Sequence, residues 1–183
     1  MAGENLPENF YEKIKPRLHK RIGGELRLAR RILDLGCGSC QLVQYLARTY
    51  HQHVTGVDIS DGSFPKRYHT SDGRRFRCIR KDAGRLEFIR DGVQDAVVSM
   101  WALHEMEHPE AILKEACRIL RPGGEILIVD FPRGSLAQRL WNEDYYSPAE
   151  INQMMNDAGF AEVRVRLIGR KQIIWSKGFR PAA

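Results

Sequence analysis

The sequence has no long run of apolar residues. Its longest candidates, Val97–Leu103 and Ile126–Val129, have the length of a strand, whereas a membrane-spanning helix needs about 20 residues. The N-terminus is charged from Glu4 onward and has no apolar signal-peptide core. We therefore expect neither a membrane span nor a secretory leader, and we expect the protein in the cytoplasm.

Cysteine is scarce, and acidic residues are not in excess. Four cysteines in 183 residues are too few for a disulfide scaffold, so we expect a reducing compartment and cysteines that simply pack. The 29 Lys and Arg against 23 Asp and Glu give a formal net charge of +6. Because the basic residues are interleaved with acidic and apolar ones, a solvated surface is favoured over an anionic partner such as nucleic acid.

Short apolar segments alternate with amphipathic helical segments along the chain. The expected strands are Arg31–Leu35, Val54–Asp58, Phe76–Ile79, Gln94–Met100, Glu125–Asp130, Ala161–Leu167 and Gln172–Trp175. The expected helices are Gln41–Thr49, Pro109–Leu120 and the one that the capping box Ser147-Pro-Ala-Glu150 opens. This alternation predicts an α/β fold, a mostly parallel sheet with helices on both faces and one antiparallel pair at an edge.

The chain shows no internal repeat and no linker, so one domain over residues 1–183 is expected, with a helical lid segment at 1–30 and a core at 31–183. Two local details are also predicted. Arg121-Pro-Gly-Gly should end the helix that begins at Pro109, and Leu167 should face the core with Val163 and Val165, because these residues alternate with arginines.

Ligands of parallel sheets bind beyond the carboxyl ends of the strands. After the first expected strand comes Asp34-Leu-Gly36-Cys-Gly38, in which two glycines allow close backbone approach to a ligand. Asp58 ends the next strand, where a carboxylate can accept both hydroxyls of a ribose. Gln41 replaces the third glycine of a dinucleotide fingerprint, and no Gly-Lys-Ser/Thr follows. The pattern favours a ribose with a small charged group and no pyrophosphate.

Five segments resemble a known family in order and spacing: ILDLGCGSC, VTGVDIS, RKDAGRLEF, QDAVVSMWALHEMEHPEAILKEACRILRPGGEILIVD and YYSPAEINQMMNDAGF. They are similar to the landmarks of class I S-adenosylmethionine-dependent methyltransferases, most of all to the small-molecule branch of the ubiquinone/menaquinone type. The resemblance covers roughly Arg31 to Gly159. It implies a Rossmann-like sheet of seven strands with the last strand antiparallel, and S-adenosylmethionine as cofactor.

The resemblance also implies roles for individual residues. The first motif would hold the methionyl end of the cofactor, Asp58 the ribose, Ile59 and the Asp82–Ala83 pair the adenine, and Ser99 to Trp101 the floor under the sulfonium. The expected cofactor-binding residues are therefore Asp34, Leu35, Gly36, Cys37, Gly38, Asp58, Ile59, Asp82, Ala83, Ser99, Met100 and Trp101. Cys40 departs from the family, which usually has a small residue there.

The expected catalytic residues follow the fourth strand. His104 and Glu105 are candidates for a general base, which is needed only if the acceptor carries a proton. Tyr11, from the N-terminal segment, is the third candidate and would position an acceptor or cover the sulfonium. The segment Phe131–Ser147, which contains Trp141, Tyr145 and Tyr146, is the other candidate for covering the substrate.

Two motifs point to metals, and neither is expected to bind one. His104-Glu-Met-Glu-His108 matches the zincin pattern, but Pro109 follows at once and disfavours one helix through both histidines. Cys37-Gly-Ser-Cys40 is a CxxC, and metal or redox use would need a further ligand pair or a redox context.

The leading hypothesis is a methyltransferase of a small-molecule acceptor, working by in-line displacement. An RNA or protein methyltransferase is the first alternative, although SMWA stands where base-amine methyltransferases have an Asn/Asp-Pro-Pro-Tyr/Phe element. A non-catalytic, cofactor-binding relative that acts as a subunit is the second. A homodimer in which the partner subunit covers the site is a further possibility. The sequence does not identify the acceptor.

Overall fold

The computed structural model describes residues 6–65 and 76–182. Its elements, in chain order, are α1 (Phe10–Glu25), β1 (Arg31–Leu35), α2 (Gln41–Tyr50), β2 (His53–Asp58), β3 (Arg77–Arg80), β4 (Gln94–Met100), the 3-10 turn η2 (Leu103–Glu105), α3 (Pro109–Ile119), β5 (Leu120–Asp130), α4 (Leu136–Trp141), α5 (Pro148–Asp157), β6 (Ala161–Ile168) and β7 (Ile173–Phe179). No described helix combines the length and the apolar character needed to cross a bilayer.

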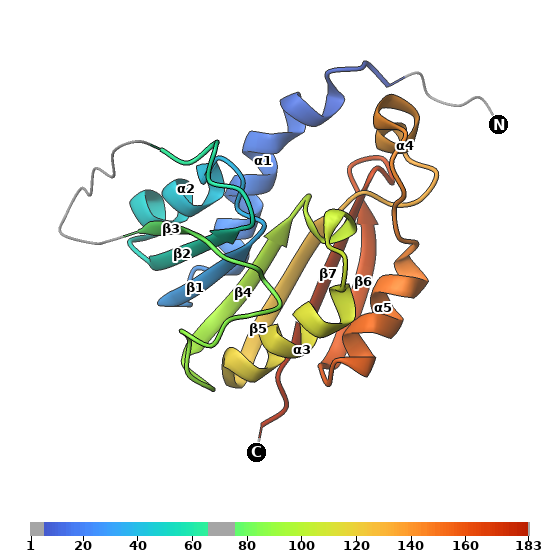
Figure 1. Cartoon of the computed structure of the whole chain (residues 1–183). Helices are drawn as coiled ribbons and strands as arrows, with labels where there is room; N and C mark the ends of the chain where they lie inside the picture. Colours follow the sequence, from blue (N-terminus) through green and yellow to red (C-terminus); the bar gives the residue numbers. More distant parts are fainter. Residues whose placement is uncertain (1–5, 66–75, 183) are drawn as a thin grey trace.

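The strands form one seven-stranded sheet in the order β3-β2-β1-β4-β5-β7-β6 (Figure 1). β3, β2, β1, β4 and β5 pair in parallel, whereas β7 is antiparallel to both of its neighbours, β5 and β6. This confirms the mixed α/β fold with an antiparallel last strand. The chain turns in opposite directions from β1 and from β4, so the switch point of the sheet lies between these two strands.

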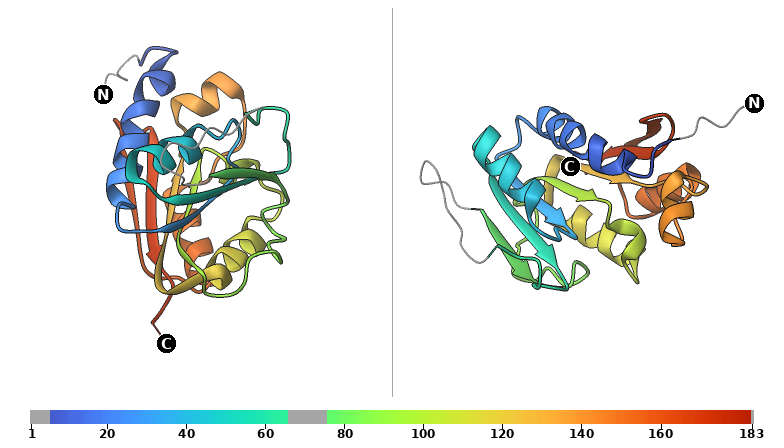
Figure 2. Two further views of the ribbon diagram at one scale, coloured as in Figure 1. Left: turned by 90° about the vertical axis from the view of Figure 1, so that its left-hand side faces the viewer. Right: turned by 90° about the horizontal axis from the view of Figure 1, so that it is seen from above.

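Helices cover both faces of the sheet (Figure 2). One apolar core lies under α1, α2 and α4 and includes Ile22, Leu46 and Ala137, all 0% exposed. The other lies under α3 and α5 and includes Ala116 and Met155, also 0% exposed. Because the central strands are buried from both sides, the middle of β4 (Ala96–Val98) and of β5 (Ile126–Val129) is a continuous apolar run rather than an alternating one.

Most predicted elements are confirmed within one or two residues, including the Ser147–Glu150 capping box, in which both reciprocal hydrogen bonds form. The predicted helix end before Arg121-Pro-Gly-Gly is confirmed, because α3 ends at Ile119. The predicted start of the next strand at Glu125 was wrong, because β5 begins at Leu120. Leu167 was also placed wrongly. It is 41% exposed and lies on β6, the edge strand of the sheet.

Two parts of the chain between strands differ from simple expectation. The segment after β5 forms the short helix α4, which no periodicity predicted. After β2, the residues up to Pro65 form bends and turns, and residues 66–75 lie outside the described part of the chain.

Gly36 is the position where backbone and packing both require glycine. Its φ is +70°, and an added Cβ would lie 2.3 Å from the Cβ of Ala102, which follows β4.

We expect Gly36→Ala to lower the free energy of unfolding by about 1–3 kcal/mol, because the backbone strain and the steric overlap add. Gly24→Ala is the matched control. A Cβ there meets nothing within 4 Å, so we expect Gly24→Ala to raise the free energy of unfolding by about 0.5–1 kcal/mol. Equal urea midpoints for the two variants would contradict this.

Candidate functional site

A cavity of about 730 Å³ opens at the carboxyl ends of β1, β2 and β4. This is the switch point of the sheet, and the volume is in the usual range for small-molecule sites. Its wall includes the loop after β1, the ends of β2 and β4, the turn after β3 and the first residues of α3. The residues that follow β1, β2, β3 and β4 therefore meet at one cavity.

The loop between β1 and α2 is held by the end of β2. The backbone N–H groups of Gly36 and Cys37 both donate to the carbonyl of Val57, at 2.9 and 3.0 Å. The N–H of Gly38 donates to Asp58 Oδ2 at 2.8 Å, and the N–H of Ser60 donates to Asp58 Oδ1 at 3.0 Å. The predicted meeting of the glycine turn with the downstream carboxylate is thus present in the structure.

Asp34 brings a buried carboxyl group to the cavity. Its side chain lines the cavity, the residue is 2% exposed, and Oδ1 has no hydrogen-bond partner among the described residues. Burial, and then the nearby charge of Asp58, raise the pKa of Asp34 to about 8. A buried acceptor without a partner is costly, so Asp34 is suited to a ligand that brings a cationic donor.

Trp101 follows β4 and forms another part of the wall. Its φ is +59°, a left-handed conformation that bulky residues rarely adopt, and its N–H donates to the carbonyl of Val129 at 2.7 Å. The indole stacks on Phe131 with the ring centroids 5.1 Å apart. This strained backbone, held by β5, turns the Trp101 ring into the cavity wall.

Helix α1 contributes two residues that sequence reasoning missed. Lys15 and His19 lie four residues apart, hence on one face of the helix, and both line the cavity. Lys15 Nζ lies 5.8 Å from the centroid of the Trp101 ring. Burial, and then the charge of Lys15, lower the pKa of His19 to about 4, so His19 is neutral at pH 7. No local motif marked either residue.

His104 lies behind the cavity wall in the turn η2. Its side chain is 3% exposed, and Nδ1 lies 2.7 Å from Asp130 Oδ1 at the end of β5. The other oxygen of Asp130 accepts the backbone N–H of His104 at 3.2 Å. Two hydrogen bonds to one buried carboxylate therefore fix the ring, with Nδ1 as the donor and Nε2 free to accept a proton.

The groups around Nε2 are acidic and aromatic. Nε2 lies 3.4 Å from Glu143 Oε2 and 3.8 Å from Glu105 Oε1, and the ring of Tyr145 is 4.5 Å away between centroids. Burial lowers the pKa of His104. The hydrogen bond to Asp130 and the charges of all three carboxylates raise it by a larger amount, so the net pKa lies above the ordinary value. Asp130 ends a strand already singled out from the sequence, whereas nothing marked Glu143.

The structure brings most of the predicted site residues together and leaves a few apart. Those that line the cavity are Asp34, Gly36, Cys37, Gly38, Asp58, Ile59, Asp82, Ala83, Met100, Trp101 and Glu105. Leu35 and Ser99 are 1% exposed and are absent from the cavity lining, so they support the wall from behind. His104 and Tyr11 lie outside the cavity lining.

Tyr11 connects α1 to α4. Its hydroxyl accepts the N–H of Ala137 at 2.9 Å and donates to Gln172 Oε1 at 3.3 Å. Its ring lies edge-on to Phe131 and to Trp101, at centroid distances of 4.8 and 6.2 Å. Since its hydroxyl is already paired on both sides, Tyr11 holds the N-terminal helix over the aromatic residues that follow β4 and β5.

The HExxH segment does not form the single helix that a zincin requires. η2 ends at Glu105, and His108 is the N-cap of α3 with the non-helical φ and ψ of −130° and 66°. His104 is buried against Asp130, while His108 lines the cavity. The two histidines thus face different surroundings.

The cysteines correct one expectation. Cys40 and Cys78 form a disulfide between the N-cap of α2 and β3, although the sequence suggested cysteines that simply pack. Cys37 and Cys117 are free, and Cys117 is only partly buried. The pairing could not be read from the spacing, because parallel pairing of β1, β2 and β3 brings residues 38 positions apart together.

The methyltransferase-domain family model matches residues 33–128, which is just over half of the chain and includes the glycine loop, Asp58 and His104. The chain belongs to this family. Its members use S-adenosylmethionine as the methyl donor, and the match confirms the class I resemblance.

Named relatives of this methyltransferase domain are larger proteins. It is 29% identical over 145 residues to 27-O-demethylrifamycin SV methyltransferase of Amycolatopsis mediterranei, covering 70% of the chain and 52% of that protein. It is 38% identical over 104 residues to a fatty-acid O-methyltransferase of Mycolicibacterium smegmatis, covering 55% and 37%. The chain thus spans about half or less of the length of these relatives.

A solved structure agrees in fold over nearly the whole domain. The putative methyltransferase from the Haloferax volcanii complex with the Trm112 activator matches with a TM-score of 0.70 at 19% identity, covering 96% of this chain and 95% of that one. At that identity the likeness shows the fold alone.

The Asp130–His104 contact can be tested by titration. Asp130→Asn removes the charge that holds the imidazolium, while burial still opposes it, so we expect the pKa of His104 to fall below its wild-type value. The histidine ring protons report this in an NMR titration. Asp157→Asn, at the far end of α5, is the control and should leave the His104 pKa unchanged. An unchanged pKa in Asp130→Asn would contradict the assignment.

Proposed function

We propose that this domain transfers a methyl group from S-adenosylmethionine to a small-molecule acceptor. The observation that carries the proposal is the unpaired, buried Oδ1 of Asp34, a residue that lines the same cavity as the glycine loop and Asp58. A cationic amino group on the ligand would pair this oxygen. A ribose would use the lone pairs that Asp58 keeps after accepting two backbone N–H groups.

The cavity residues fit the cofactor in charge and in shape. A Cβ at Gly38 would meet nothing within 4 Å, so the loop leaves open space beside Asp58. Ile59 is 73% exposed at the cavity edge, where an adenine ring could cover it. Asp82, Ala83, Met100 and Trp101 also line the cavity. Leu35 and Ser99 hold these strand ends in place.

The bound cofactor would supply an electrophilic methyl group on a good leaving group, so the protein mainly has to align the acceptor, which can contribute about 7–11 kcal/mol. For an acceptor that carries a proton, His104 is the proposed general base. Asp130 fixes its tautomer and stabilises the imidazolium that forms. Glu105, which lines the cavity, and Glu143 lie next to Nε2 and raise the proton affinity of the ring.

The acceptor side is proposed to lie under α1 and the segment between β5 and α5. Aromatic rings gather there: Tyr11, Trp101, Phe131, Trp141 and Tyr145 contact one another. Glu143 and Tyr145, joined by a 2.8 Å hydrogen bond, cover Nε2, so an acceptor must displace them. This arrangement supports a role for the N-terminal segment as a lid over the acceptor. The aromatic rings favour an apolar acceptor, and a nearby base favours one that carries a hydroxyl group.

The acceptor panel follows from the relatives and from the sequence resemblance. A relative named for 27-O-demethylrifamycin SV and one named for fatty acids support hydroxyl and carboxyl acceptors. The ubiquinone/menaquinone branch stays a prediction, tested by including a quinol. RNA is the competing class, and methyl incorporation into RNA that falls steeply with salt would favour it.

Cofactor binding should release a proton from Asp34. Its pKa of about 8 leaves it mostly protonated at neutral pH, and a bound ammonium group lowers that pKa. Calorimetry with S-adenosylhomocysteine, in buffers of different ionisation enthalpy, should therefore show release of most of one proton at pH 7. The release should disappear well above the pKa of Asp34.

Asp34→Asn should bind more weakly and release no proton, because its amide does not titrate. Asp144→Asn, an exposed residue outside the cavity, should behave like the wild type. Proton release that persists in Asp34→Asn would remove Asp34 from the cofactor site.

His104→Gln should reduce turnover far more than cofactor affinity. In a labelled-methyl assay with an acceptor found in the panel, we expect a loss of about 10²–10⁴-fold in kcat, with S-adenosylhomocysteine affinity nearly unchanged. The wild-type rate should rise with pH through an apparent pKa above 6.5, because the base must be neutral. His53→Gln, on the exposed start of β2, is the control. Full turnover in His104→Gln would exclude it as the base.

A further inference from the structure

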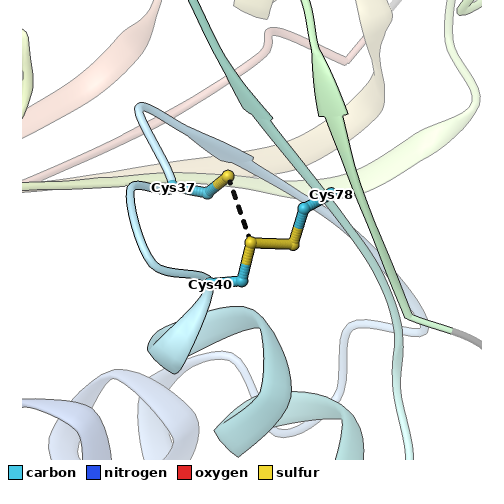
Figure 3. A group of neighbouring side chains, drawn as sticks. All are labelled: Cys37, Cys40 and Cys78. Atoms are coloured by element: carbon cyan, nitrogen blue, oxygen red, sulfur yellow. Dashed lines mark hydrogen bonds between the residues drawn. A yellow bond between two sulfur atoms is a disulfide. The ribbon is translucent and has the colours of Figure 1, made fainter. Parts of the chain in front are cut away.

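Three cysteine sulfurs meet beside the cofactor loop (Figure 3). They come from the loop after β1, the N-cap of α2 and β3, and all three Sγ atoms lie within 4.8 Å of one another. Cys37 Sγ is 3.8 Å from Cys40 Sγ, which is bonded to Cys78 Sγ. The sequence offered only the CxxC pair, and the sheet supplies the third sulfur from residue 78.

The spacing of these sulfurs is that of metal ligands. In a tetrahedral zinc site with Zn–S bonds of about 2.3 Å, neighbouring sulfurs are about 3.8 Å apart, which is the separation of Cys37 and Cys40. Two cysteines with two residues between them are also the usual chelating pair in such sites. Three protein ligands with one position left open form a known zinc arrangement.

The surroundings restrict what can occupy this cluster. Cys37, Cys40 and Cys78 are 8%, 0% and 9% exposed, and an added Cβ at Gly56 would lie 2.6 Å from Cys37 Sγ. The neighbouring strand therefore leaves no room for a bulky ligand against Cys37. A single ion between the sulfurs needs no such room, and soft cations prefer thiolate ligands.

We propose that Cys37, Cys40 and Cys78 bind one thiophilic metal cation when the Cys40–Cys78 disulfide is reduced. The ion and the disulfide are alternative cross-links, because each joins the start of α2 to β3. The ion would also include Cys37, which lines the cofactor cavity. The site does not depend on the proposed methyl transfer.

The replacement of the Cys40–Cys78 disulfide by the bound ion balances in electrons and protons. A dithiol reductant gives two electrons and two protons to the Cys40–Cys78 bond and becomes a disulfide. Each of the three thiols then loses its proton to solvent as its sulfur bonds to the ion. Burial, together with Asp34 and Asp58, raises the pKa of Cys37, so the free thiol stays protonated. A coordinating cation removes such a proton outright.

The test uses Cd²⁺ as the probe on the full chain, reduced with a dithiol and freed of reductant under anaerobic conditions. We expect one Cd²⁺ per chain by calorimetry, a sulfur-to-cadmium charge-transfer absorption, and a higher Tm for the loaded protein. Oxidised protein, with the disulfide intact, should bind at least about 100-fold more weakly. This lower bound is reasonable, because loss of one partner in the outer shell of a metal site alone lowers the metal affinity about 10–100-fold.

Cys78→Ser should lose the tight Cd²⁺ site and the gain in Tm, while Cys117→Ser, which removes the free cysteine outside the cluster, should keep both. Cys37→Ser supplies a second variant that leaves the disulfide pair intact, and it should also lose the site. Circular dichroism confirms that each variant is folded.

Two results would overturn the proposal: reduced wild type that binds no Cd²⁺, or cluster variants that bind it as tightly as Cys117→Ser. The outcome is separate from that of the proposed function. Protein that binds S-adenosylhomocysteine but no Cd²⁺ refutes the metal site alone. Protein that binds Cd²⁺ but no S-adenosylhomocysteine supports the metal site and refutes the proposed cofactor site.

Discussion

The hydrogen bond from the N–H of Gly38 to Asp58 Oδ2, 2.8 Å long, ties the loop after β1 to the end of β2. Together with the two N–H groups that donate to the Val57 carbonyl, it sets the shape of the cavity floor. The left-handed φ of Gly36 and Gly38 makes these contacts possible. Without them, Asp34 and Asp58 would not face one ligand-sized space.

The site has two parts with different environments. The cavity itself is open and carries charged groups, which suits a nucleoside with a cationic end. His104 and Asp130 lie behind it in an aromatic, nearly dry setting, where their mutual hydrogen bond is strong. Glu143 and Tyr145 separate His104 from solvent. An acceptor that enters under α1 would therefore reach the proposed base only when the segment after β5 moves away from His104.

Much of the fold and the cofactor loop could be predicted because the signals are local. The run RILDL is apolar up to a glycine turn, and Ser147-Pro-Ala-Glu150 carries its own hydrogen-bond pattern. The errors have physical causes. The start of β5 was placed too late because Arg121–Gly124 has the composition of a turn, yet β5 begins at Leu120, which pairs with Gln94. Leu167 fits the alternation of β6 but lies near the end of this edge strand, where it is 41% exposed.

The sequence by itself determined the order of strands and helices, the glycine turn and the carboxylate that follows β2, because periodicity and turn chemistry act over a few residues. Only the tertiary structure decided which distant residues meet. It placed Asp130 against His104, Lys15 and His19 at the cavity, and Cys78 against Cys40. The reason is that parallel strands join segments far apart in the chain, so their contacts depend on register and packing and leave no local pattern.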